Sequence, residues 1–509
     1  MKRMALLLLC LLLALAPAVG AAEEADRAGE ILADLLKFKM TQSGAADVAD
    51  WAANYLPSTM GVGGEWYALG LLQGSGLLNL TACREGLLDY LAAHTVRAAS
   101  TRQKLALTLR GLGGGEDFIA ATMADSVGQQ GLMSWVWGLH LINNGCQSSA
   151  YPQEEVIKTL LELRKADGGW AITGNAADVD ATAMTLQALA PHREDAAVAA
   201  AIDAALTLLS ARQLESGGYT SYGVENAESA AQMIVALCAL NVDPFTDARF
   251  IKHGATLLDA LEAFRLADGS FSHERGGAYN ESATAQVFLA LAAYARFQAG
   301  EGSLYQLDEG APVPPGEMKT GLGYKAIAAM GIGGAAVLSC VVLLLMGKRH
   351  PKNFLAVALI AAALLAFVYF TDFQTADSYY SAAMTKTDAI GTVTLTIRCD
   401  KVAGQAVHIP ADGLILPETT LPIARGDTVY TLLTDAARAH AIHMEASGAQ
   451  GMMYIHGIGN IYEFDYGDLS GWLYSVNGET FSLGCDQYVL TPGDRIEWRY
   501  TLEMGKDIN

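Results

Sequence analysis

An internal repeat in the first 305 residues constrains the fold more than any other feature of this chain. In each copy, a tight turn of small residues ends in an aromatic residue and leads into an apolar, helix-like run. The three clear copies are ADGGW (166–170) before DATAMTLQAL (180–189), ESGGY (215–219) before ESAAQMIVAL (228–237), and ADGSF (267–271) before SATAQVFLAL (282–291). The copies recur about every 50 residues, which is the length of two helices and their loops. The pattern therefore predicts an all-α domain over residues 24–305, built as a closed ring of inner and outer helices.

The spacing of apolar residues changes after residue 390. GTVTLTIRC (391–399) alternates polar and apolar residues as a strand does, and GDTVYTLLTDAARAH (426–440) has helical spacing. Two further strand-like runs, GWLYSVNGE and DRIEWRY, are bounded by Asn-Gly and Pro-Gly-Asp turns. Residues 391–509 are therefore expected to form a small α+β domain.

Two long apolar stretches separate these domains. Residues 326–346 carry no charge and are long enough to span a membrane as a helix, and residues 354–371 are just long enough. The basic turn at 347–353 predicts a cytoplasmic loop, so that both flanking domains face outward. A Pro-rich linker (306–325) and a polar linker (372–390) flank the hairpin. The expected fold class is a multidomain chain with an all-α (α/α) toroid, a transmembrane helical hairpin and a small α+β C-terminal domain.

The N-terminus has the features of a secretory signal peptide over residues 1–22. Lys2 and Arg3 precede an uncharged run of Leu and Ala that ends in small residues. Together with the hairpin, this predicts a cell-membrane protein whose two large domains are extracellular. The formal net charge of −21 argues against nucleic acid as a partner.

Five of the cysteines, Cys83, Cys146, Cys238, Cys399 and Cys485, lie outside the apolar segments. An extracellular location would allow disulfides among them. The first three are expected either as one bridge and a free thiol or as three buried free thiols. No CxxC pair or Cys/His cluster occurs in the sequence, so no metal site is expected.

Asp178 and Asp180 lie one residue apart at the start of the apolar run in the first repeat copy. Three roles fit this position: a proton source for catalysis, hydrogen bonding to a ligand, or helix capping. Capping fits because an aspartate before a helix satisfies free backbone N–H groups and favours the helix dipole. The residues alone leave these alternatives open.

The histidines give a weaker indication of function. His140 lies in the apolar, aromatic run WVWGLHLI and is expected to be a core residue. His192 and His273 are predicted to lie in loops, and the sequence shows no partner for either of them.

The DGGW, SGGY and DATAM motifs resemble those of the α/α-toroid superfamily of terpenoid cyclases, prenyltransferases and cobalamin carriers. The runs YEFDYGDLSGWLYSVNG (462–478) and YVLTPGDRIEWRY (488–500) resemble the C-terminal β-domain of the transcobalamin and intrinsic factor family, in its bacterial form. A toroid followed by this β-domain is the architecture of cobalamin-binding proteins. The two resemblances imply a bacterial surface protein with a corrinoid such as cobalamin as its ligand, and not as a catalytic cofactor.

In that family a corrin lies between toroid and β-domain, contacted by polar side chains at the starts of inner helices. Such side chains suit a corrin because its rim bears amides that donate and accept hydrogen bonds. The implied ligand-binding residues are Asp178, Asp180, Thr182, Asn226, Glu228, Ser229, Asn280, Glu281 and Ser282, with Trp472, Tyr474 and Asn477 in the β-domain. Ala176 and Ala177 stand where transcobalamin has a cobalt-binding histidine, so no metal ligand is implied from that position. The resemblance also implies a disulfide between Cys399 and Cys485.

The resemblance weighs against catalysis. Squalene-type cyclases carry an Asp-x-Asp-Asp run, and its last position is Ala181 in this chain. We therefore predict a non-enzymatic, membrane-anchored extracytoplasmic protein that binds cobalamin or another corrinoid for uptake, with a membrane importer as a further partner. The alternatives are a non-catalytic surface module for interaction or adhesion, and a terpenoid-type cyclase with Asp178 or Asp180 as its acid.

Overall fold

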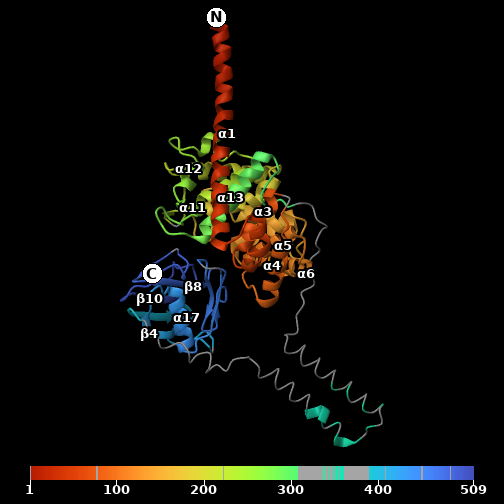
Figure 1. Ribbon diagram of the computed structural model, residues 1–509, viewed down its shortest axis with the longest axis vertical. Coiled ribbons are helices and arrows are strands. Elements are labelled where there is room, and N and C mark those ends of the chain that lie inside the picture. Colours follow the sequence, from red (N-terminus) through yellow and green to blue (C-terminus); the bar gives the residue numbers. More distant parts are fainter. Residues whose placement is uncertain are drawn as a thin grey trace. The chain divides into compact units, whose positions relative to one another are not determined.

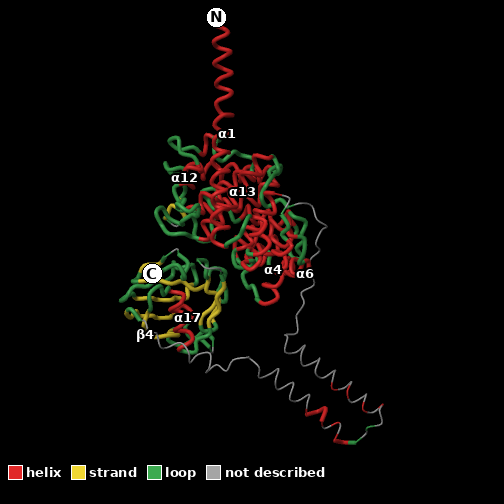
Figure 2. The backbone as a smooth tube through the Cα atoms, in the orientation of Figure 1, coloured by secondary structure: helices red, strands yellow, loops and turns green. Residues whose placement is uncertain are grey.

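The computed structural model describes residues 2–75, 78–221, 223–307, 389–406, 408–448, 451–481 and 483–508, with isolated positions between 336 and 359. The described residues up to 307 form helices joined by loops, with a short antiparallel ribbon of β1 (Thr220–Ser221) and β2 (Val224–Glu225). Residues 389–508 carry the remaining strands (Figure 2).

The helical part forms a closed ring. Its helices are α1 (Lys2–Ser43), α2 (Val48–Asn54), α3 (Gly64–Ser75), α4 (Thr81–Ala93), α5 (Ala99–Leu112), α6 (Glu116–Asp125), α7 (Gly131–Asn143), α8 (Gln153–Glu162), α9 (Val179–Leu189), α10 (Ala196–Arg212), α11 (Ala227–Ala239), α12 (Leu257–Glu262) and α13 (Glu281–Ala299). Among the described residues, α3, α5, α7, α9, α11 and α13 each contact the next, and α13 contacts α3 again. Figure 1 shows α3 beside α13. Helices α6, α8, α10 and α12 each flank one of these ring helices.

Glycines shape the turns that precede the last three ring helices. Gly168, Gly217 and Gly269 have φ angles of 104°, 82° and 92°, a conformation that glycine adopts without steric cost. At Gly217, an added Cβ would lie 2.2 Å from the carbonyl oxygen of Thr256. A larger residue at this position would therefore have to displace the backbone at the start of α12.

The aromatic residue that ends each turn is a core residue. Trp170, Tyr219 and Phe271 are each 0% exposed. The indole Nε1 of Trp170 donates to the carbonyl oxygen of Leu160 at 2.6 Å. Thr182 Oγ1 accepts from the backbone N–H of Trp170 at 2.9 Å and donates to its carbonyl oxygen at 3.0 Å. Thr182, a predicted ligand residue, thus ties the first turn to α9.

The C-terminal part is built on a five-stranded sheet. Its elements are β3 (Gly391–Arg398), β4 (Leu414–Ile423), α17 (Val429–Ala439), β5 (Met444–Ser447), β6 (Tyr454–Ile458), β7 (Ile461–Tyr462), β8 (Gly471–Val476), β9 (Glu479–Thr480) and β10 (Arg495–Thr501). The sheet has the order β4-β3-β10-β8-β9, with β10 and β3 parallel and the other neighbours antiparallel. Strands β5, β6 and β7 form a second, antiparallel sheet. Asn477 and Gly478 join β8 to β9 with φ angles of 55° and 86°, as expected of an Asn-Gly hairpin.

The fold-class prediction was wrong about the transmembrane hairpin. Crossing a membrane takes roughly 20 consecutive apolar residues in a helix, and no helix among the described residues meets the requirements of length and apolar character. Most of the predicted spans, 326–346 and 354–371, and of the segments beside them lie outside the described residues. The signal peptide and the domain boundaries stay predictions.

The implied disulfide between Cys399 and Cys485 is also absent. All five cysteines of the described residues are buried free thiols. Burial is the main cause that raises the pKa of Cys399 to about 11 and that of Cys485 to about 12, so both sulfurs are enclosed as neutral thiols. For Cys83, Cys146 and Cys238, the structure agrees with the alternative of three buried free thiols.

Candidate ligand-binding site

Three predicted site residues begin successive ring helices. Asp178, Asn226 and Asn280 precede α9, α11 and α13. Each side chain accepts a hydrogen bond from the backbone N–H three residues further on, at 2.9, 2.8 and 2.9 Å respectively. Loss of such a cap typically costs about 1 kcal/mol. Helix capping is therefore the observed role of these three side chains.

The two aspartates of the first repeat differ in their surroundings. Asp178 uses both carboxylate oxygens, because its Oδ2 accepts from Ser221 Oγ at 2.8 Å in addition to the capping bond. Asp180 lies in the first turn of α9, and its buried Oδ1 completes no hydrogen bond within the described residues. The hydroxyl oxygen of Ser229 on α11 is also buried, and it too completes no hydrogen bond within the described residues. It is close enough to Asp180 to lower the pKa of that carboxyl.

Burial raises the pKa of the Asp180 carboxyl to about 7, and the charge of Asp178 adds to this effect. The hydroxyls of Ser229 and Ser221 lower the pKa in part, and Glu228 raises it further. Desolvation and like charge both disfavour the ionised carboxylate. Near neutral pH, Asp180 is therefore present both as an acid, which can donate and accept hydrogen bonds, and as a carboxylate, which can only accept them.

Replacing Asp180 with asparagine should stabilise the protein above neutral pH but not in acid. The unfolded pKa is about 3.9, so the native state binds more protons in the window between the two pKa values, and wild-type stability falls as the pH rises through it. The asparagine amide does not ionise, so the variant does not lose stability in this way as the pH rises. In urea unfolding, the two proteins should be about equally stable near pH 4, and the variant more stable by about 4 kcal/mol near pH 8. If the difference in stability between the variant and the wild type were the same at both pH values, the prediction of a raised pKa for Asp180 would be wrong.

Glu228 is paired with a histidine for which the sequence showed no partner. His273 Nδ1 lies 3.0 and 2.9 Å from the two carboxylate oxygens of Glu228, and both side chains are largely buried. The hydrogen bond to Glu228 raises the pKa of His273 against the opposing effect of burial. The raised pKa favours the imidazolium form, whose charge is opposite to that of Glu228. His273 follows Glu228 by 45 residues, about one repeat, and this spacing is the signal that could have predicted the pair.

A chain of amide hydrogen bonds, called the amide ladder below, joins α9, α11 and α13. Gln187 Nε2 donates to Gln232 Oε1 at 3.0 Å, and Gln232 Nε2 donates to Gln286 Oε1 at 2.8 Å. Gln286 Nε2 donates in turn to Ser282 Oγ at 3.2 Å, which engages another predicted ligand residue. The ladder was not predicted from the sequence, although Gln232 and Gln286 occupy the same position in two of the repeats.

Glu281 closes the ring. Its carboxylate accepts from Lys39 Nζ of α1 at 2.9 and 3.0 Å and from the hydroxyl of Tyr67 of α3 at 2.7 Å. The side chains of Lys39 and Glu281 are each 10% exposed. Burial raises the pKa of Tyr67 well above its usual value, and the charge of Glu281 adds to this, so the phenol remains a hydrogen-bond donor. Lys39, Tyr67 and Glu281 form what we call the seam cluster.

The three candidates in the C-terminal part lie in its core or in a turn. Trp472 Nε1 donates to the carbonyl oxygen of Ile461 at 2.8 Å. The hydroxyl of Tyr474 donates to the carbonyl oxygen of Leu483 at 2.9 Å. Both aromatic side chains are buried. The side-chain amide of Asn477 is hydrogen-bonded to residues at the start of β10. These polar groups are satisfied within their own domain, which favours a packing role.

Among the predicted residues, Asp180 and Ser229 therefore stand apart, because each has a buried polar atom that completes no hydrogen bond in the described part of the chain. No group of three or more His, Cys, Asp or Glu side chains in that part is placed to hold a metal ion. The pair offers a carboxyl and a hydroxyl from two adjacent helix starts. Together they can donate and accept hydrogen bonds, which is the chemistry that recognises an amide.

Comparisons with known proteins give one match to the C-terminal part and one to most of the chain. Residues 426–501 match the family model described as "Domain of unknown function (DUF4430)". Among solved structures, the chain is similar to a crystal structure of haptocorrin in complex with Cbi. That match has 12% sequence identity and a TM-score of 0.47, and it covers 93% of this chain and 97% of that chain. No curated protein matches this sequence. At such identity and TM-score, the likeness to haptocorrin carries no conclusion about fold or ligand.

Proposed function

We propose that this chain is a non-enzymatic binding protein for a corrinoid or a similar amide-bearing ligand, which it contacts at the starts of α9 and α11. The observation that carries the proposal is the pair of buried, unsatisfied atoms, Asp180 Oδ1 and Ser229 Oγ. A buried polar atom without a partner costs about 1–3 kcal/mol. A ligand that supplies the missing hydrogen bonds would remove this cost.

A carboxamide is the chemical complement of this pair. As an acid, Asp180 can donate to an amide oxygen, and as a carboxylate it can accept from an amide N–H. The Ser229 hydroxyl can do either. A corrin bears several such amides on its rim, and the helix starts that resemble those of cobalamin carriers are the ones that hold Asp180 and Ser229.

Other parts of the proposal come from the sequence. The C-terminal domain would cover the bound ligand, as in the family that it resembles. The N-terminal signal would direct the chain out of the cytoplasm, and a membrane importer would then receive the ligand.

Titration of the full chain with cobalamin and with its base-free precursor tests the proposal, using calorimetry and the corrin absorbance in parallel. We expect saturable binding with a changed corrin spectrum. Asp180→Ala should weaken binding by about 10-fold or more, because a hydrogen bond to an ionisable group is worth roughly 1.5–3 kcal/mol.

Asp195→Ala is the matched control, since Asp195 caps α10 by accepting from the N–H groups of Ala197 and Val198 at 2.7 and 3.1 Å. This variant loses a helix cap, which Asp180→Ala does not, and it should still bind as the wild type does. Absence of heat and of spectral change with both corrinoids would overturn the proposal. If the two substitutions weakened corrinoid binding equally, Asp180 would not be a ligand contact.

A further inference from the structure

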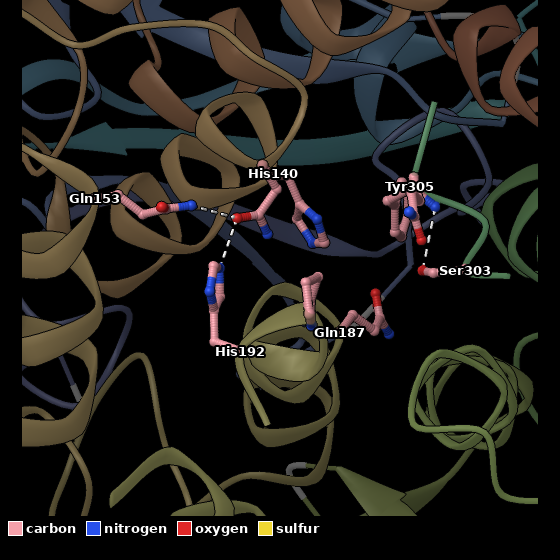
Figure 3. Close-up of a pocket in the computed structure, with 9 residues that line it drawn as sticks. His140, Gln153, Gln187, His192, Ser303 and Tyr305 are labelled. Atoms are coloured by element: carbon pink, nitrogen blue, oxygen red, sulfur yellow. Dashed lines mark hydrogen bonds between the residues drawn. The ribbon is translucent and has the colours of Figure 1, made fainter. Parts of the chain in front are cut away.

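We propose that a second pocket, at the carboxyl ends of α7 and α9, binds a small, uncharged, planar molecule that both donates and accepts hydrogen bonds, as an aromatic carboxamide does. This α7–α9 pocket has a volume of about 130 Å³. His140 of α7, Gln187 of α9, His192 and Tyr305 lie around it (Figure 3). Gln187 lies in the last turn of α9 and Asp180 in the first, so this pocket is distinct from the site proposed above.

Several polar groups face the α7–α9 pocket without partners. The hydrogen bonds that His140 and Tyr305 make in the described structure involve only their backbone atoms, which leaves the imidazole and the phenol unbonded. His140 is only 3% exposed. Gln187 Nε2 donates to Gln232 in the amide ladder, and Gln187 Oε1 remains as an acceptor. The pocket thus presents donors and acceptors together.

The charge of the pocket selects against ions. No Asp, Glu, Lys or Arg is among the described residues that line it. Burial lowers the pKa of His140 to about 3 and lowers that of His192 as well. Both imidazoles are therefore neutral near pH 7, and each has one donor and one acceptor nitrogen. A charged ligand would lose its hydration without meeting a counter-charge, which is costly.

Two asparagines hold the pocket walls in place. Asn143 Oδ1 accepts from Gln153 Nε2 at 3.2 Å and lies 2.7 Å from His192 Nε2 (Figure 3). An amide oxygen only accepts, so Nε2 of neutral His192 carries the proton and its Nδ1 is left as an acceptor. Asn144 Nδ2 donates to the carbonyl oxygen of Tyr305 at 2.8 Å. Walls that are already ordered lower the entropy cost of binding.

Aromatic side chains and the pocket volume indicate the shape of the ligand. The rings of His140 and Tyr305 have centroids 4.7 Å apart, and each lies 5.5 Å from the ring of Trp137. Their faces and edges provide an apolar surface for a flat molecule. An engineered cavity of roughly 150 Å³ holds benzene, so a pocket of about 130 Å³ fits one small ring whose polar edge meets His140 and Gln187.

Nicotinamide and nicotinate test the proposal, because they share a ring and differ in charge. The full chain, labelled at histidine, would be titrated with each compound while the imidazole NMR signals are followed. We expect nicotinamide to shift the His140 and His192 signals saturably, with a dissociation constant of about 0.1–5 mM for so small a ligand. Nicotinate should bind at least about 10-fold more weakly.

His140→Phe keeps a planar ring but removes both nitrogens, and it should weaken nicotinamide binding about 10-fold. Tyr305→Phe removes only a hydroxyl and should weaken it a few-fold, which keeps the test decisive if the first variant folds poorly. His94→Phe, at an exposed position, is the matched control and should leave binding unchanged. The proposal is overturned if nicotinamide leaves both histidine signals unshifted, if nicotinate binds equally well, or if neither pocket variant weakens binding. Because the test uses no corrinoid, its outcome is independent of the function proposed for Asp180 and Ser229.

Discussion

Replacing Trp170 with alanine is expected to lower the free energy of unfolding by about 3–5 kcal/mol. The indole is fully buried, and its removal leaves a cavity between the first repeated turn and α9. The carbonyl oxygen of Leu160 also loses the hydrogen bond from Nε1 at 2.6 Å. Guanidinium unfolding, followed by circular dichroism, measures the change.

Ile172→Ala is the control for this prediction. Ile172 lies two residues further on and is 37% exposed, so its truncation should change stability by less than about 1 kcal/mol. If both substitutions cost the same, the aromatic residue of the turn would not have the packing role that its burial indicates.

Lys39→Ala should lower the free energy of unfolding by about 3 kcal/mol. The substitution removes one partner of the buried pair in the seam cluster and leaves the Glu281 carboxylate inside the protein with only Tyr67 as a donor. An uncompensated buried charge is much more costly than the pair itself is stabilising. The same unfolding measurement applies.

Lys158→Ala provides the matched control, because the side chains of Lys158 and Glu162 are 74% and 65% exposed and 3.7 Å apart. A surface pair of this kind contributes about 0.5 kcal/mol or less. The double substitution Lys39→Met with Glu281→Leu should recover at least half of the loss, since it leaves no buried charge. If the double variant were less stable than Lys39→Ala, the ion pair itself would stabilise the seam cluster, and the loss in Lys39→Ala would not come from the unpaired charge of Glu281.

Local sequence pattern predicted the elements well. The apolar runs at 180–189, 228–237 and 282–291 coincide with α9, α11 and the first half of α13. In the C-terminal part, the strand expected at 391–399 is β3, and the helix expected within 426–440 is α17. These predictions succeeded because periodicity and turn residues act between neighbours in the chain.

The chemistry of the candidate site could not be predicted in the same way. Asp178 and Asp180 look equivalent in the sequence, yet Ser221, more than 40 residues away, donates to Asp178. The buried Oδ1 of Asp180 completes no hydrogen bond within the described residues. The partner of Glu228 comes from the next repeat for the same reason. Side-chain pairing across a ring depends on which helix starts become neighbours in space, and a pattern within one repeat does not contain this information. The implied disulfide came from a resemblance, and it too depends on spatial neighbours.

The closure of the ring has a consequence for the synthesis of this protein. Lys39 and Tyr67 are 242 and 214 positions away from Glu281, so their contacts form only after a very long loop has closed. Contacts of such high sequence separation slow folding. On the ribosome, α1 and α3 emerge well before α13, and their apolar faces remain without their final partner until the last repeat has been made. The growing chain is therefore expected to depend on chaperones during this interval, and a nascent chain that stalls before α13 should aggregate rather than fold.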